Sequence, residues 1–199
     1  MLDRFARYLG GRVLEVNAGP AHVTEHLFDR DLLVVTASEP VHVATLRRRF
    51  GHLANVETAV VDYYSDPPAP LFEVDTALVF DGLQRSPEPK VFLTNVAAPV
   101  ESAGHALIQV SAHAGFYGPS DEAAGHARRF DRAELEDLVR ACGLELVAIE
   151  EFNRFGALGW RGNHALGSGR ITPGAAKAFD LLVSLAKRVE AVLPGRGLS

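Results

Sequence analysis

The residues best placed for chemistry lie at a tight turn, residues 17–21, directly after the apolar stretch Val13–Val16. Gly19 and Ala18 carry little or no side chain, so a ligand can approach the backbone there, and a helix after the turn would present unpaired N–H groups. Glu39 follows about 20 residues after Gly19, at the end of a second apolar stretch, where nucleotide-binding sheets hold ribose hydroxyls. The spacing favours a nucleotide-like ligand, although Glu39 also suits the start of a helix.

Two aspartates occupy comparable places farther along the chain. Asp62 follows the third apolar stretch, and Asp81 follows the fourth. Because parallel strands end at one edge of a sheet, Asp62 can face a ligand bound there, and Asp81 can face the ligand or its reaction partner. Both are equally the kind of residue found in an ordinary turn.

A further polar group fills the long connection 111–130, which has the length of a functional loop or lid. His113 and His126 are candidate catalytic bases, because histidine titrates near neutral pH and can accept a proton from a hydroxyl or an acidic carbon. The neighbouring arginines suit an anionic substrate group. Structural roles within the loop stay open as alternatives. The candidate substrate-binding residues are Tyr117, Asp121, Arg128 and Arg129.

Composition narrows the partners and the compartment. The 199 residues are 47% hydrophobic and carry a formal net charge of −5, which predicts one domain without a broad basic surface for nucleic acid. A single Cys142 excludes an internal disulfide, and no long apolar run or secretory leader is evident, so we expect a cytoplasmic protein without a membrane span. His22 and His26 lack a third ligand, so no metal site is expected.

Apolar stretches alternate with helical patterns, which predicts an α/β fold with a doubly wound, mostly parallel sheet. The expected strands are Arg12–Val16, Leu32–Thr36, Val56–Val61, Thr76–Phe80, Ala106–Val110 and Leu144–Glu150. Four helices are expected. The first starts at Pro20 and presents Val23, Leu27 and Phe28 on one side, and the second follows Pro40 to about Gly51 and buries Val43, Leu46 and Phe50. The third runs from Asp131 to Gly143, with Glu134 completing a capping box and with Leu135, Leu138 and Val139 in the core. The last helix is amphipathic and covers about 173–193.

The strand order, the turn and the carboxylates together resemble those of a class I S-adenosylmethionine-dependent methyltransferase, whose sheet is Rossmann-like. In that family an acidic residue opens the glycine loop, a carboxylate ends the second strand, and an aspartate follows the third beside the adenine. The resemblance maps these positions onto Glu15, Gly19, Glu39 and Asp62, with Asn17 inside the loop. It implies S-adenosylmethionine as the cofactor and a small molecule as the methyl acceptor.

The second half of the chain is similar to a bacterial branch of these enzymes that is often associated with glycosyltransferases and secondary metabolism. The similar segments are Val110–His113, Phe116–Asp121, Gly125–Phe130 and Phe152–Trp160. The resemblance implies an acceptor from secondary or glycan metabolism.

Several positions depart from the family pattern. Asn17 and Ala21 stand where glycines are usual, Pro20 lacks an N–H, and Gln84–Arg85 replace a common Glu-His pair. A second hypothesis therefore stays open: a non-methylating protein of the same fold, either a cyclase or rearrangement enzyme or a partner-binding subunit. A nicotinamide enzyme ranks lower, because the Gly-x-Gly-x-x-Gly spacing is absent. The chain stops at Ser199 where relatives continue into a last strand, so we expect an open sheet edge, with which a homodimer is compatible.

Overall fold

A computed structural model describes residues 2–65 and 72–152 of the chain. Its contacts divide the chain into two compact units, Met1–Val110 and Ser111–Ser199. The predicted helix at residues 173–193 and nearly all of the segment Phe152–Trp160 lie outside the described residues. Both stay predictions, as do the single domain, the missing last strand and the homodimer.

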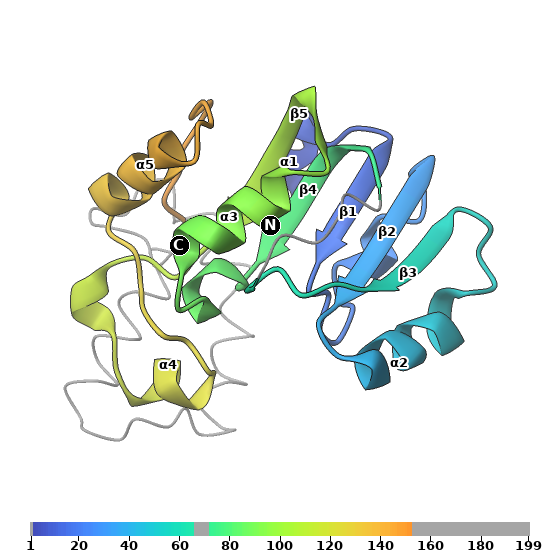
Figure 1. The fold of residues 1–199 in the computed structure, drawn as a ribbon, viewed down its shortest axis with the longest axis horizontal. Helices are drawn as coiled ribbons and strands as arrows, with labels where there is room; N and C mark the ends of the chain where they lie inside the picture. The colour runs from blue at the N-terminus through green and yellow to red at the C-terminus, as the bar shows by residue number, and fades with distance from the viewer. Residues whose placement is uncertain (1, 66–71, 153–199) are drawn as a thin grey trace, which may run out of the picture. The chain divides into compact units, whose positions relative to one another are not determined.

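The first unit is built on a sheet of five parallel strands in the order β3-β2-β1-β4-β5 (Figure 1). The strands are β1 (Arg12–Val16), β2 (Leu32–Ala37), β3 (Val56–Val60), β4 (Val74–Phe80) and β5 (Val100–Gln109). Almost every residue of β1, β2 and β4 is buried, as expected for strands covered on both faces. The α/β class and the parallel sheet are confirmed, while β4 and β5 begin earlier than predicted.

The strand order reverses at β1. Strands β1, β2 and β3 follow one another toward one edge, whereas β4 and β5 lie on the other side of β1. Successive connections leave the sheet in opposite directions at such a point, and open α/β sheets bind their ligands outside the carboxyl ends of the strands there. The segments that follow β1 and β4 are therefore the natural ligand-binding segments of this sheet. We call the region between the carboxyl ends of β1 and β4 the switch point.

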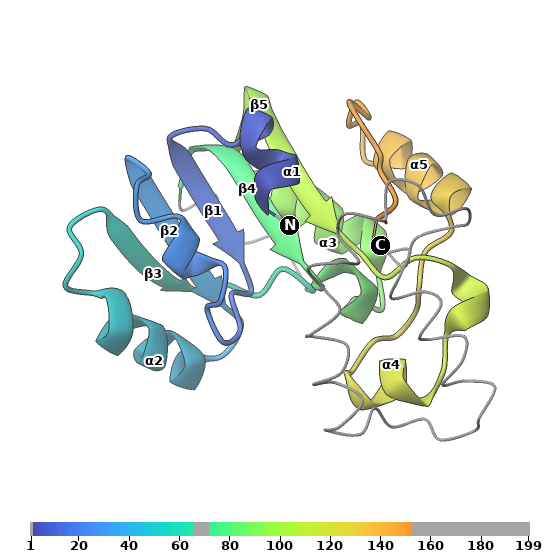
Figure 2. The same ribbon diagram turned by 180° about the vertical axis from the view of Figure 1, so that it is seen from behind.

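Helices cover both faces of the sheet. In Figure 1, α3 (Pro89–Ala97) lies in front of β4 and β5, and in Figure 2, seen from behind, α1 (Leu2–Phe5) lies on the other face. Phe5 of α1 packs its ring 6.0 Å from that of Phe80 at the end of β4. Two 3-10 helices, η1 (Ala6–Tyr8) and η3 (Leu83–Arg85), follow α1 and β4 respectively. Among the helices of the described residues, none has the length and apolar character that a bilayer crossing requires.

The predicted helix after Pro40 is confirmed as α2 (Pro40–Phe50). It starts with proline at its first position, where a missing N–H breaks no hydrogen bond. Its buried side chains are Val43, Leu46 and Phe50, which are the three predicted to face inward.

The helix predicted to start at Pro20 is wrong. The connection from β1 to β2 contains a single 3-10 turn, η2 (Thr24–His26). Gly19 has φ of 54° and Ala21 has φ of 65°, and a right-handed helix cannot pass through residues in the left-handed conformation. Leu27 is nevertheless buried, so its apolar side chain anchors a loop to the core instead of a helix.

The strand predicted at Leu144–Glu150 is also wrong. These residues form neither helix nor strand, and Val147 is 60% exposed. An apolar run favours an extended backbone, but a strand also needs a neighbour that pairs with its N–H and C=O groups. Within the described residues the sheet has no strand beyond β5.

The second unit begins with a loop that is closed on itself. Ala112 and Phe130 form an isolated parallel bridge, which brings the two ends of the predicted 111–130 loop together. Between them lie η4 (Ala114–Phe116) and α4 (Pro119–Ala123). The loop therefore has local structure of its own.

The predicted helix after Asp131 is confirmed as α5 (Arg132–Ala141), but two of its details differ. The Asp131 side chain makes no capping bond to the helix; its carboxylate accepts the N–H of Ala114 at 3.3 Å. Val139 is the buried member of the predicted core face, whereas Leu135 and Leu138 are half-buried. The helix ends as predicted before Gly143, which has φ of 72°.

One buried amide fixes the backbone after β3. The side-chain Nδ2 of Asn95, on α3, donates to the carbonyl oxygens of Tyr63 at 3.1 Å and Ser65 at 2.7 Å. Asn95 is 2% exposed, so water cannot easily replace it as a donor.

We expect Asn95→Ala to lower the free energy of unfolding by about 2–4 kcal/mol, because two backbone acceptors lose their donor in a largely buried place. Urea unfolding measures the change. Thr94→Ala, on an exposed position of the same helix, is the matched control and should change it by less than about 0.5 kcal/mol. Equal effects of the two substitutions would contradict the bracing role of Asn95.

Candidate functional site

The turn after β1 is held in an uncommon backbone conformation. Asn17, Gly19 and Ala21 all have φ between 53° and 65°, and two of them carry a side chain. Such residues persist only where neighbouring contacts determine them, and they cluster at binding sites. A Cβ placed on Gly19 would meet no atom closer than 3.9 Å, so the outer side of this turn is open.

Thr36 on β2 supplies the contacts that hold the turn. Its hydroxyl donates to the backbone oxygen of Glu15 at 2.9 Å and accepts the N–H of Asn17 at 3.3 Å. Its own carbonyl accepts the N–H of Ala18 at 2.9 Å. Three positions in and just before the turn, Glu15, Asn17 and Ala18, are thereby fixed to the neighbouring strand.

Glu15 lies beneath the turn and not on its surface. It is 3% exposed, and its Oε2 accepts the hydroxyl of Thr24 at 2.6 Å. Burial raises the pKa of Glu15 to about 7, while the hydrogen bonds from Thr24 oppose that rise. The Glu15 carboxyl thus joins β1 to η2, and its predicted cofactor-binding role stays a prediction.

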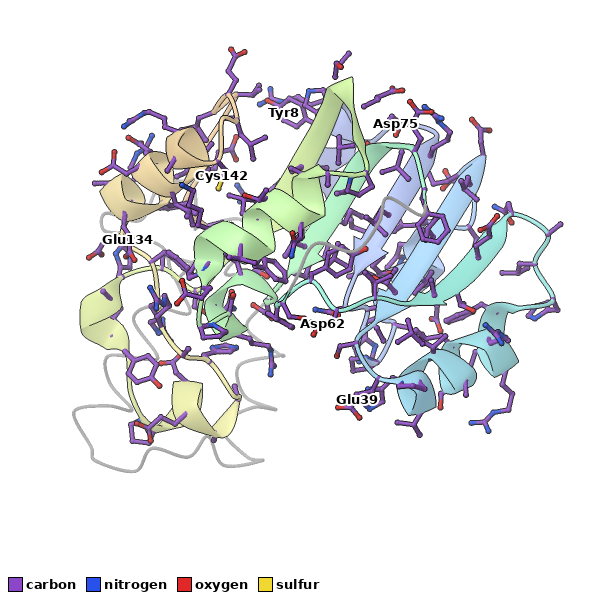
Figure 3. All side chains as sticks on the ribbon, viewed as in Figure 1. Tyr8, Glu39, Asp62, Asp75, Glu134 and Cys142 are labelled. Atoms are coloured by element: carbon purple, nitrogen blue, oxygen red, sulfur yellow. The ribbon has the colours of Figure 1, made fainter. Side chains whose placement is uncertain are left out.

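Glu39 and Asp62 are exposed at the edge where the strands end. Figure 3 shows both near the arrowheads of the sheet, whereas Asp75 and Tyr8 lie at the opposite edge. Glu39 is the N-cap of α2, yet its carboxylate makes no capping bond, which leaves it available to a ligand. Asp62 accepts the N–H of Tyr64 at 2.9 Å and the hydroxyl of Ser65 at 2.6 Å, and these bonds lower its pKa.

Asp81, directly after β4, also adopts the left-handed conformation, with φ of 56°. Its Oδ1 accepts the side-chain amide of the fully buried Gln84 at 2.7 Å, and its N–H donates to the carbonyl of Gln109 at 3.3 Å. The Asp81 side chain is therefore oriented by Gln84, while the residue itself stays exposed.

Tyr64 is a member of this site that the sequence did not predict. Its hydroxyl accepts the Nδ2 of Asn17 at 3.2 Å and donates to the carbonyl of Gly82 at 3.4 Å. Its ring stacks on Phe92 of α3, with centroids 4.9 Å apart. Burial raises the pKa of Tyr64, which keeps the phenol protonated near neutral pH. The only sequence signal is an aromatic pair directly after Asp62, which is also typical of a core.

The second unit gathers its predicted residues around one carboxylate. Asp121 is 2% exposed; its Oδ2 accepts Nε of Arg129 at 2.9 Å and the N–H of Gly118 at 3.1 Å. Nδ1 of His126 lies 3.3 Å from its Oδ1, and the hydroxyl of Tyr117 donates to the His126 carbonyl at 2.9 Å. Asp121, His126 and Arg129 thus stabilise the loop, and their predicted substrate and catalytic roles stay predictions.

Near His113 and Arg128 lie carboxylates other than Asp121. His113 has φ of 62°, its ring lies edge-on to Phe116 with centroids 5.5 Å apart, and its Nε2 is 3.9 Å from a carboxylate oxygen of Glu151. Arg128 lies 3.9 Å from the carboxylate of the half-exposed Glu134. Within residues 2–65 and 72–152, no three His, Cys, Asp or Glu side chains gather as a metal site would need.

Solved structures share this architecture, although no family model and no curated protein matches the sequence. A candidate methyltransferase from Bacillus halodurans C-125 is 18% identical with a TM-score of 0.63, over 74% of this chain and 70% of its own. The trans-methyltransferase CalH, in complex with SAH, is 24% identical with a TM-score of 0.54, over 67% and 44%. The [4+2]-cyclase SpnF is 22% identical with a TM-score of 0.56, over 70% and 55%.

The chain has the fold of class I methyltransferases. It spans about half the length of CalH and SpnF. Within this methyltransferase fold, the structure brings Asn17, Tyr64 and Gly82 together at the switch point between β1 and β4.

The raised pKa of Glu15 predicts a pH-dependent stability. Its folded value of about 7 lies above the ordinary 4.5, so the unfolded chain loses this proton first and stability falls as the pH rises from 4.5 to 7. At about pH 8 we expect Glu15→Gln to raise the free energy of unfolding by up to about 3 kcal/mol, an advantage that disappears below about pH 4.5.

Urea unfolding at several pH values measures this difference. Glu57→Gln, on the exposed side of β3, is the control and should show no such pH-dependent gain. A gain for Glu15→Gln that is the same at every pH would argue against a buried, neutral carboxyl.

The buried ion pair of the second unit gives a separate prediction. Asp121→Ala removes the carboxylate that faces Arg129 and His126, so we expect the free energy of unfolding to fall by about 3–5 kcal/mol. The exposed neighbour Glu122→Ala should change it by less than about 0.5 kcal/mol. Thermal or urea unfolding of the full chain compares the two. A small effect of Asp121→Ala would mean that water hydrogen-bonds to the Arg129 guanidinium in place of the carboxylate.

Proposed function

We propose that this protein binds S-adenosylmethionine at the carboxyl ends of β1 and β2 and transfers its methyl group to a small-molecule acceptor. One observation carries the proposal. Glu39, two residues after β2, is exposed and makes no capping bond, while Thr36 on β2 holds the open turn after β1. A carboxylate beside such a turn suits a ribose and the group attached to it.

The residues present fit most of an adenosyl group. Glu39 would accept hydrogen bonds from the ribose hydroxyls, and the open space over Gly19 would admit the ligand close to the backbone. Asp62, with its lowered pKa, would stay charged beside the base, and Asp81 would face the cofactor or the acceptor. The cofactor supplies an activated methyl group on sulfur, so the protein needs chiefly to position the two reactants.

An acceptor that must lose a proton also needs a base. His113 is our first candidate and His126 the second, since both belong to the loop that follows β5. The Asp121 contact supports a structural role for His126, which favours His113 as the base. Tyr117, Arg128 and Arg129 remain candidates for the substrate pocket. The resemblance of the second half supports an enzyme of secondary or glycan metabolism, and the single cysteine is compatible with the cytoplasm that the composition predicts.

A second candidate is a protein of the same fold that does not transfer a methyl group. The absence of an α-helix between β1 and β2 favours it, because the N–H groups that such a helix would present to an anionic ligand group are not there. Incubation with S-adenosylmethionine labelled in its methyl group and candidate acceptors distinguishes the two. Label in a small-molecule product supports methyl transfer, and cofactor binding without it favours the second candidate.

Calorimetry with S-adenosylhomocysteine tests the cofactor site directly. We expect Glu39→Ala to weaken binding by roughly 10- to 100-fold, the value of hydrogen bonds to a charged group. Glu57→Ala on exposed β3 is the matched control and should bind like the unaltered protein. No heat at millimolar ligand, or equal affinity of the two variants, would overturn the proposed site.

A further inference from the structure

We propose that Tyr64 determines the affinity of the switch point by closing it, so that a ligand must displace the phenol to bind between β1 and β4. This inference rests on the proposed function, because it concerns the same edge of the sheet. It assigns to Tyr64 a role that the methyltransferase fold alone does not predict.

The hydrogen bonds of Tyr64 reach both sides of the switch point. Asn17 follows β1 and Gly82 follows β4, and one phenol oxygen lies 3.2 Å from the Asn17 amide nitrogen and 3.4 Å from the Gly82 carbonyl. A single oxygen within hydrogen-bond reach of both partners leaves no room for a ligand atom between them. A bound ligand and this bridge therefore exclude each other.

The contacts around Tyr64 make the closed arrangement a defined state. The side chain of Asn95 donates hydrogen bonds to the carbonyl groups of Tyr63 and Ser65, which flank Tyr64 in the chain. The Tyr64 ring stacks on Phe92, which lies beneath Gly82. A Cβ on Gly82 would come within 3.0 Å of that phenylalanine ring, so glycine permits the close approach. The backbone on either side of Tyr64 and the ring itself are thus both held in place.

One atom of the bridge is left unsatisfied. The Oδ1 of Asn17 is buried and has no hydrogen-bond partner while the amide nitrogen of the same side chain is bound to Tyr64. A buried acceptor without a donor is unfavourable. A ligand that carries a donor, such as the ammonium group of an amino acid, would satisfy Oδ1 once the phenol has moved. The unsatisfied Oδ1 of Asn17 therefore favours replacement of the phenol by a ligand that carries a hydrogen-bond donor.

The binding-competent fraction of such a protein sets its apparent affinity. Tyr64→Phe keeps the ring on Phe92 and removes both hydrogen bonds of the phenol. Because the 3.4 Å bond to Gly82 is long, we expect a loss of about one net hydrogen bond and therefore about two- to tenfold tighter binding of S-adenosylhomocysteine. Tyr64→Ala should gain at least as much. Tyr8→Phe, at the opposite edge of the sheet, should bind like the unaltered protein (Figure 3).

A double-mutant cycle separates the bridge from simple crowding of the turn. Asn17→Gly suits the left-handed backbone and removes the same hydrogen bond from the other side. If the bridge is the cause, the affinity gains of Asn17→Gly and Tyr64→Phe will be less than additive. Additive gains would mean that the asparagine crowds the ligand independently of Tyr64, which overturns the proposal.

Calorimetry of the full chain and its variants, with far-UV circular dichroism to verify folding, decides between the outcomes. Tighter binding by both Tyr64 variants supports the inference. Equal or weaker binding by them overturns it and leaves the proposed cofactor site intact. Binding by Tyr64→Ala but not by the unaltered protein supports the inference and overturns the proposed function. No binding by any variant overturns both.

Discussion

The hydrogen bonds of Thr36 to the end of β1 are the constraint on which the rest of the site depends. Left-handed backbone at Asn17 and Ala21 is unfavourable by itself, so the turn needs contacts that compensate it. From one buried position on the adjacent strand, the hydroxyl of Thr36 both donates and accepts a hydrogen bond, and its backbone carbonyl accepts a third. Glu39 follows β2 by two residues, so the strand that holds the turn leads directly to the exposed carboxylate.

The buried Glu15, beneath the same turn, also helps to hold the connection between β1 and β2. The connection after β1 lacks the helix that its apolar pattern predicts, so fewer backbone groups satisfy one another there. Glu15 and Thr24 join the strand to the loop through a side-chain hydrogen bond of 2.6 Å. The contact requires the carboxyl to leave water, which raises its pKa. The hydrogen bond between Glu15 and Thr24 thereby ties the loop to β1 where no helix does so.

The parts that sequence reasoning predicted are those with a local physical cause. Apolar runs and a proline start were enough for β1 to β4 and for α2, because burial and capping act within a few residues. The helix after Pro20 failed where backbone handedness, not hydrophobic periodicity, decides the path. The strand at Leu144–Glu150 failed because pairing needs a partner strand. The Tyr64 bridge joins residues 47 positions apart, so no local pattern could reveal it.

Two departures from the family pattern gain a physical explanation from these contacts. Gln84 stands where glutamate is common, and its buried amide donates to Asp81 at 2.7 Å. A glutamate there would set two carboxylates against each other, so Gln84 and the left-handed Asp81 suit one another. Asn17 likewise replaces a glycine and gains the hydroxyl of Tyr64 as a partner. Both Gln84 and Asn17 form side-chain contacts of their own, so each of the two positions acts together with a partner residue.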